Sequence, residues 1–151
     1  MNRSKHEASA VPAGGDLKLD FVALDALVRG SPFHRWLGVT LGKLDPDGVE
    51  IHMPWREEFV SDPHIRYTHG GILAALIDLS ADYAIAAKLG RGVPTIDMRV
   101  DYHKAAMPGP LIARARVIKL GGTLATAEAR LYDEHDALIA SGRGVYLTLG
   151  R

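Results

Sequence analysis

Apolar residues follow two different spacings along the chain, one helical and one with a period of two. Between residues 19 and 28 leucine and valine recur at roughly helical spacing, and the glycine, serine and proline at 30–32 end the pattern. The stretch from 70 to about 89 is rich in alanine, leucine and isoleucine, lacks proline and is followed by Gly90, a typical helix C-cap. The sequence therefore predicts a short helix and a long one.

Residues 95–103 show the period of two. The polar positions are Thr95, Asp97, Arg99, Asp101 and His103, and the apolar positions between them are Ile96, Met98, Val100 and Tyr102. Only a half-buried strand explains this alternation, because successive side chains of a strand point to opposite faces.

Further strands are predicted before and after the long helix in the chain. Residues 38–55 contain a hairpin that turns at 45–48, where proline and glycine supply the backbone angles of a turn. Residues 111–120, 124–132 and 137–149 are separated by a Gly-Gly pair and by a polar turn, and form consecutive antiparallel strands. The expected fold class is α+β, with one antiparallel sheet covered by a single long helix.

The length of 151 residues suits one compact domain. Residues 1–16 are polar and rich in Ala, Gly, Ser and Pro, so we expect a flexible tail there and a single domain over 17–151. Residues 56–68 have no clean period and exceed the usual connection length, which is typical of a binding loop.

The long helix has two different faces when its residues are placed at about 100° each around the axis. The bulky side chains that share one face and should pack on the sheet are Ile72, Leu73, Leu76, Leu79 and Tyr83. The small or acidic neighbours of Asp78 on another face are Gly71, Ala74, Ala75, Ala81 and Asp82. Such a flat face favours close approach by a second backbone or by a ligand.

His69 and Asp78 are about 13 Å apart along the helix axis and lie on opposite sides of it. They cannot act as a pair within one chain. If the helix start and Asp78 belong to one site, two antiparallel copies of the helix must each contribute one half, which predicts a homodimer.

Composition excludes several kinds of chemistry. The chain has no cysteine, and its 18 basic residues balance 18 acidic ones, so neither thiol catalysis nor binding to nucleic acid or a membrane surface is expected. The seven histidines lack metal-ligand spacing, and no nucleophile elbow surrounds any serine. The N-terminus has no apolar signal segment, so a cytoplasmic location is expected.

Residues 69–78, HGGILAALID, resemble the HGG-x6-D motif of the hotdog-fold acyl-CoA thioesterases, in the subgroup typified by phenylacetyl-CoA thioesterases. Residues 94–102 are similar to the strand that follows in that family, and further likeness at 31–39, 107–109 and 140–144 extends the match over about 20–149. The resemblance implies a hotdog fold, a long central helix wrapped by a curved antiparallel sheet, and a dimer that often pairs into a homotetramer. It also implies hydrolysis of an acyl-CoA thioester without metal or cofactor.

The resemblance assigns roles to four residues. Asp78 becomes the catalytic carboxylate, as nucleophile or as general base, and the backbone N–H of Gly70 polarises the thioester carbonyl at the positive end of the partner's helix. Thr95 stands where the family often has a hydroxyl that orients water, although a plain strand threonine fits as well. His69 is expected to cap the helix and position the glycines, with a direct catalytic role as the alternative.

Further residues are expected to contact the substrate. Gly71 leaves room at the helix start, and Asp82 is both a site neighbour and the rival acid to Asp78. Family members usually have an asparagine in the loop before the motif, but this chain has Pro63 there, so His64 is the candidate substitute. The candidates for contacts with CoA phosphates are Arg66, Arg99, Lys104, Arg114 and Arg116.

The missing asparagine keeps a second hypothesis open. A hotdog dimer could bind acyl-CoA or another apolar ligand without turning it over. Dehydratases of the same fold are less compatible, because they resemble patterns with a catalytic histidine. The acyl group is not predicted by the sequence.

Overall fold

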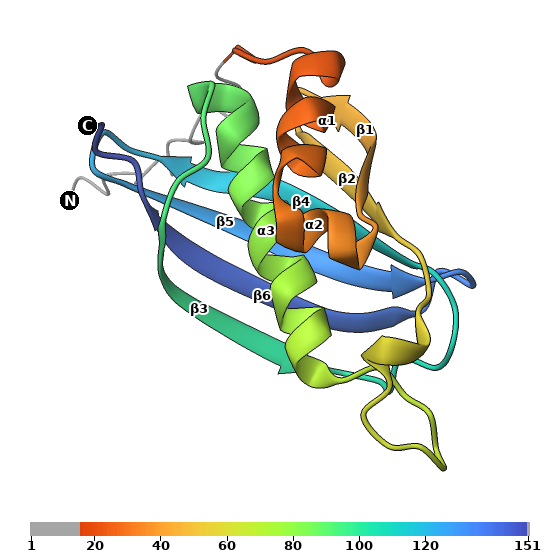
Figure 1. The fold of residues 1–151 in the computed structure, drawn as a ribbon. Coiled ribbons are helices and arrows are strands. Elements are labelled where there is room, and N and C mark those ends of the chain that lie inside the picture. The colour runs from red at the N-terminus through yellow and green to blue at the C-terminus, as the bar shows by residue number, and fades with distance from the viewer. Residues whose placement is uncertain (1–15, 151) are drawn as a thin grey trace, which may run out of the picture.

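The computed structural model describes residues 16–150 and builds them into one sheet with helices on one of its faces (Figure 1). The helices are α1 (Phe21–Gly30), α2 (Pro32–Leu37), α3 (Gly70–Leu89) and the short 3-10 helix η1 (Glu57–Phe59). The strands are β1 (Thr40–Asp45), β2 (Gly48–Met53), β3 (Thr95–Tyr102), β4 (Leu111–Leu120), β5 (Leu124–Asp133) and β6 (Leu138–Leu147). The flexible tail predicted for 1–16 lies outside the described residues, apart from Asp16.

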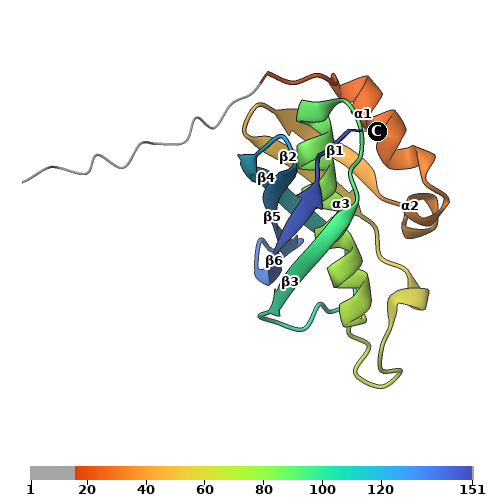
Figure 2. The same ribbon diagram turned by 90° about the vertical axis from the view of Figure 1, so that its left-hand side faces the viewer.

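The sheet is antiparallel, with the strand order β1-β2-β4-β5-β6-β3. The hairpin β1-β2 and the meander β4-β5-β6 are confirmed, but β3 does not lie between them. It follows α3 across the sheet and pairs with β6, so it forms an edge (Figures 1 and 2). Seen from the side, the curved sheet is one layer and the helices form the other (Figure 2).

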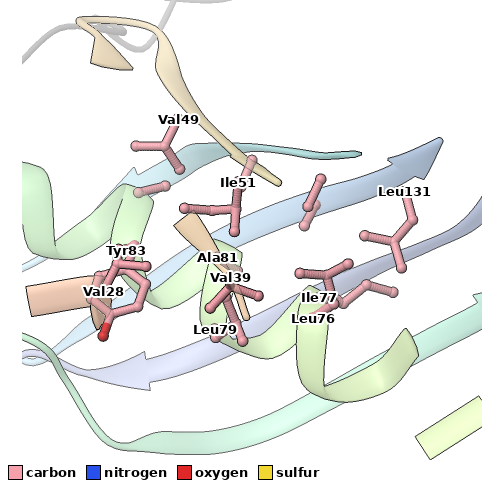
Figure 3. Close-up of a cluster of buried hydrophobic side chains, with 14 of the residues drawn as sticks. Val28, Val39, Val49, Ile51, Leu76, Ile77, Leu79, Ala81, Tyr83 and Leu131 are labelled. Atoms are coloured by element: carbon pink, nitrogen blue, oxygen red, sulfur yellow. The ribbon is translucent and has the colours of Figure 1, made fainter. Parts of the chain in front are cut away.

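Helix α3 begins and ends where its sequence predicts. His69 is its N-cap and Gly90, in the left-handed conformation, closes its C-terminus. The inner faces of β4 and β5 carry mostly alanine, and these small side chains let the helix approach the sheet closely. They are Ala113, Ala115, Ala125, Ala127 and Ala129, all buried. Leu76, Ile77 and Leu131 fill the space between the layers (Figure 3).

Two details of the helices differ from the prediction. Helix α1 ends at Gly30 as predicted, but a second helix that was not predicted, α2, begins at once, because Pro32 occupies its first turn, where a proline loses no helical hydrogen bond. Helix α3 is also buried more widely than its bulky stripe suggested. Ile77 and Ala81 are fully buried, so Ala81 does not belong to the open face around Asp78.

Candidate active site

Asp78 lies midway along α3 and is half-buried. Its Oδ1 accepts a hydrogen bond from the Thr95 hydroxyl at 2.8 Å and another from the Tyr146 hydroxyl at 3.2 Å. No residue among 16–150 donates to the other oxygen, Oδ2. The carboxylate is therefore held through one oxygen, and the other is free to act.

Thr95 reaches Asp78 because β3 contains a bulge. The register between β3 and β6 shifts between Thr95 and Asp97, so Ile96 is the extra residue and is 56% exposed. Strict alternation would have placed Thr95 with Asp97 on the outer face. The bulge turns it to the inner face, opposite Tyr146, where it meets the helix.

Tyr146 is a residue of the site that the sequence analysis did not identify. Its ring is fully buried on the inner face of β6, and its hydroxyl also lies 3.2 Å from the backbone carbonyl of Asp78. Burial, reinforced by the charge of Asp78, raises the pKa of Tyr146 well above its usual range, so the hydroxyl keeps its proton. A buried tyrosine usually has a hydrogen-bond partner, but the sequence does not indicate which one.

The start of α3 offers a free amide. The His69 ring accepts a hydrogen bond from the Gly71 N–H at 2.8 Å, which is the predicted capping. The Gly70 N–H has no acceptor among the described residues, whereas the Gly70 carbonyl accepts from the Tyr102 hydroxyl at 3.1 Å. Of the two glycines proposed for the site, only Gly70 thus presents an unused donor at the positive end of the helix.

A cavity of about 390 Å³ opens beside Gly70. Its lining residues are Tyr67, Thr68, Gly70, Leu73, Tyr102, His103, Lys104, Ala105 and Ala106. Most of these come from the segments before α3 and after β3, which lie together at this end of the helix (Figure 1). The sequence analysis missed this cavity because residues far apart in the chain form it.

Within one protomer the free amide of Gly70 lies at the start of α3, whereas the free carboxylate oxygen of Asp78 lies midway along it. Eight residues separate Gly70 from Asp78, which is about 12 Å along the axis. An amide that stabilises an oxyanion must lie about 3 Å from it, and the attacking group must be as close to the same carbonyl. The two groups of one chain cannot serve one thioester.

Asp82 lies one turn beyond Asp78 and has a structural partner. Its Oδ1 accepts from the Val93 N–H at 2.9 Å and so ties the loop after α3 to the helix. Burial, with a smaller contribution from the charge of Asp78, raises the pKa of Asp82 to about 6. Each acid has one oxygen without a donor among residues 16–150, but only Asp78 accepts from two side-chain hydroxyls, whereas Asp82 binds a backbone amide of the loop. Asp78 is therefore the stronger candidate of the two acids.

The raised pKa of Asp82 predicts a pH-dependent gain in stability for Asp82→Asn. In the unfolded chain the carboxyl titrates near its ordinary value of 3.8, so the folded state binds the proton more tightly. The buried charge costs nothing below about pH 4, and its cost grows up to about pH 6 and then stays constant. Asparagine retains an oxygen for Val93 and removes the charge. We expect the variant to unfold with a free energy about 2 kcal/mol higher than the wild type above pH 7.

Urea unfolding at one protomer concentration, repeated from about pH 4 to pH 8, measures this difference. Asp47→Asn, in the exposed turn between β1 and β2, is the control and should give a difference that does not change with pH. A pH-independent effect of Asp82→Asn would show that burial of this carboxylate is not costly.

The remaining predicted site residues lie away from Asp78. The loop between η1 and α3 extends beyond the start of that helix (Figure 1). His64 lies in this loop and is exposed, and its backbone N–H donates to the Asp62 carboxylate. Arg66 has a positive φ of 69° and pairs with Glu57. The structure therefore does not place His64 or Arg66 against the Asp78 carboxylate of their own chain.

The other basic candidates also have acidic partners. Arg99 pairs with Asp101, and Arg116 pairs with Glu128. Arg114 contacts Glu50 and Asp136, whereas Lys104 is 3.8 Å from Asp133. All four are exposed side chains. Lys104 is the one that also lines the cavity beside Gly70.

Within residues 16–150 no helix is both long and apolar enough to cross a bilayer. The same residues contain no group of three or more His, Asp or Glu side chains placed to hold a metal ion.

Comparison with known proteins places the fold in one family. The family model of the thioesterase superfamily matches residues 66–140, which include α3 with Gly70 and Asp78 and the strands from β3 to β5. A solved structure of a thioesterase superfamily protein is 49% identical, with a TM-score of 0.83, and the match covers 84% of this chain and 96% of that one. The chain belongs to the thioesterase superfamily.

Two more relatives agree with this assignment. Zebra fish thioesterase superfamily member 2 is 30% identical with a TM-score of 0.77, over 88% of this chain and 100% of that one. The medium/long-chain acyl-CoA thioesterase YigI of Escherichia coli strain K12 is 24% identical over 139 residues, which cover 82% of this chain and 89% of that one. The expected hotdog fold is confirmed, and membership of the superfamily supports a hydrolase that acts on thioesters.

Proposed function

We propose that this thioesterase superfamily member hydrolyses an acyl-CoA thioester to the free acid and CoA. The observation that carries the proposal is the state of Asp78, whose Oδ1 is fixed by two hydroxyl groups while Oδ2 has no partner among residues 16–150. A carboxylate held in this way is suited to attack a carbonyl carbon or to take a proton from water.

The reaction needs water as its only co-substrate. In the general-base route, Asp78 removes a proton from water, the oxygen adds to the thioester carbonyl carbon, the C–S bond breaks, and the proton passes to the leaving sulfur of CoA. In the nucleophilic route, Oδ2 adds to the carbonyl carbon, the C–S bond breaks with release of the CoA thiolate, and water then hydrolyses the resulting anhydride to the free acid and regenerates Asp78. Both routes develop negative charge on the carbonyl oxygen, and the Gly70 N–H at the helix start is the donor that stabilises it. Neither route requires a cofactor or a metal ion.

The site is formed by two copies of the chain. Gly70, Ala74 and Asp78 are spaced four residues apart and therefore lie on one side of α3. In two antiparallel helices related by a two-fold axis near Ala74, residue 70 of each faces residue 78 of the other. Gly71, Ala74 and Ala75 carry little bulk and are not fully buried, so two helices can approach closely there.

The edge position of β3 supports this dimer. This strand of eight residues ends the sheet on the side where Tyr102 contacts the start of α3. An exposed edge of that length favours pairing with another strand, and a second copy of β3 would extend the sheet and bring the two α3 helices together. Association of such dimers into a tetramer stays a prediction.

The cavity and the family support the proposed substrate class. The cavity beside Gly70 is lined largely by apolar and aromatic groups, including Leu73, Tyr102 and Ala106, and suits an acyl chain or the pantetheine arm. The relative YigI is named as an acyl-CoA thioesterase of medium and long chains. Lys104, which lines the cavity, is available for the phosphates of CoA.

Release of free thiol from a panel of short, aromatic and long acyl-CoAs tests the proposal. We expect turnover of at least one class, with the free acid and CoA formed in equal amounts. Tight binding of the same compounds without thiol release would instead support a non-catalytic acyl-CoA binder and would contradict the proposed hydrolysis.

A further inference from the structure

Tyr146 contacts Asp78 at two points. Its hydroxyl lies 3.2 Å from the carboxylate Oδ1 and 3.2 Å from the backbone carbonyl of the same residue. A phenol has one hydrogen to donate, so Oδ1 and the backbone carbonyl oxygen of Asp78 share it. The contact therefore fixes the side chain relative to its own backbone.

Gly144 makes room for the tyrosine ring. Gly144 and Tyr146 are two residues apart on β6 and point to the same inner face. A Cβ at position 144 would lie 2.6 Å from both the hydroxyl and Cε2 of Tyr146, far inside van der Waals contact. The ring thus lies directly over the glycine, and any side chain at 144 would push it away from Asp78.

The two hydroxyl donors form one cross-strand pair. Thr95 is the register partner of Tyr146, so both approach Oδ1 of Asp78 from adjacent strands. The bulge at Ile96 brings Thr95 to this face, and Gly144 lets the Tyr146 ring lie flat. Two local departures from regular sheet structure thus serve the same carboxylate oxygen.

We infer that Tyr146 is a positioning residue of the proposed hydrolase. Its hydroxyl holds Oδ1 of Asp78 and thereby turns Oδ2 toward the substrate, and Gly144 supplies the space that this geometry needs. The inference rests on the proposed function for its catalytic consequence, but the contact itself can be tested without turnover.

The hydrogen bond between Tyr146 and Asp78 can be measured through its effect on the charge of the carboxylate. The titratable groups that face Asp78 are Asp82 on the same helix and Tyr146 from β6. A hydrogen bond donated to a carboxylate favours its charged form, and the Tyr146 hydroxyl remains a donor because burial raises its pKa. Loss of the hydroxyl should therefore make Asp78 easier to protonate.

Tyr146→Phe is the direct test, because it removes the hydroxyl and keeps the ring. We expect kcat to fall roughly 10-fold to 100-fold with KM changed less than about twofold, since misorientation affects the chemical step. The acidic limb of the kcat/KM profile should move to higher pH, because a hydrogen bond donated to the carboxylate is lost. Gly144→Ala should shift the limb in the same direction.

Tyr83→Phe is the matched control. Tyr83 is also a buried tyrosine, but its hydroxyl donates to the Leu27 carbonyl and not to Asp78. This variant removes a buried hydrogen bond of similar kind, so it should lower stability without moving the acidic limb. If the acidic limb moved as far in Tyr83→Phe as in Tyr146→Phe, the shift would reflect a general loss of stability, and the inference would be overturned.

Carbon-13 NMR of the labelled Asp78 carboxyl separates this inference from the proposed function. Its titration midpoint should move to higher pH in Tyr146→Phe and stay in place in Tyr83→Phe, whether or not the protein turns over acyl-CoA. An unchanged midpoint in Tyr146→Phe overturns the positioning role even in an active enzyme. A wild type without thioesterase activity, together with a shifted midpoint, would instead overturn the proposed function and leave the contact established.

Discussion

Replacement of Asp78 by asparagine should lower kcat for acyl-CoA hydrolysis roughly 10³-fold. Asparagine has the same shape, and its oxygen can still accept from Thr95 and Tyr146, so the fold and the local hydrogen bonds should persist. What is lost is the negative charge, and with it both the nucleophile and the base. A continuous assay of released CoA thiol measures the rate, and circular dichroism checks the fold.

Substitutions of two other aspartates serve as comparisons for Asp78→Asn. Asp101→Asn, on the exposed outer face of β3, is the control and should keep wild-type turnover. Asp82→Asn tests the rival acid and should retain turnover within a few-fold, because its carboxylate binds the Val93 amide. If Asp82→Asn were inactive and Asp78→Asn active, the catalytic carboxylate would be Asp82.

Replacement of Gly70 by proline should reduce kcat by roughly 10²-fold to 10³-fold, the effect of losing one oxyanion donor. Gly70 is the first residue of α3, where proline is well tolerated because its missing N–H makes no helical bond. His69 has φ −57° and ψ 134°, which suits a residue before proline. The substitution thus removes the proposed donor with little cost to the helix.

Gly70→Ala is the matched comparison, because it adds a side-chain carbon and keeps the N–H. The new Cβ would lie 3.3 Å from the nearest ring atom of Tyr102, and this ring is 55% exposed and can move. We expect Gly70→Ala to stay within about 10-fold of the wild type, well above the proline variant. Equal losses in both variants would point to crowding and remove the Gly70 amide from the mechanism.

Most helices and strands could be predicted from the sequence, because local sequence patterns favour the same elements that the fold contains. The cap at Gly90, the uninterrupted alanine-rich run after His69 and the alternation from 95 to 102 each specify an element by local physics. The position of β3 at the sheet edge was not predictable in this way. It depends on the path of the chain across the sheet, which no local pattern encodes.

The site residues that lie close together in the sequence could be predicted, whereas those that are far apart in the sequence could not. The HGG-x6-D motif places Gly70 and Asp78 on one helix, so both were identified from the sequence. Tyr146 is 68 residues beyond Asp78, and only the strand register brings it back to the helix. The bulge at Ile96 also contradicts simple alternation, so Thr95 was assigned to the site by family resemblance and not by its pattern.

The claim that each site combines Gly70 of one subunit with Asp78 of the other can be tested by mixing two inactive variants. Asp78→Asn and Gly70→Pro, carrying different affinity tags and co-expressed, form mixed dimers that are isolated through both tags. One of the two sites in such a dimer contains both intact groups, so the account predicts about half of wild-type turnover per mixed dimer. If mixed dimers form and stay as inactive as the parent variants, or if the wild type is a monomer while active, the shared site does not exist.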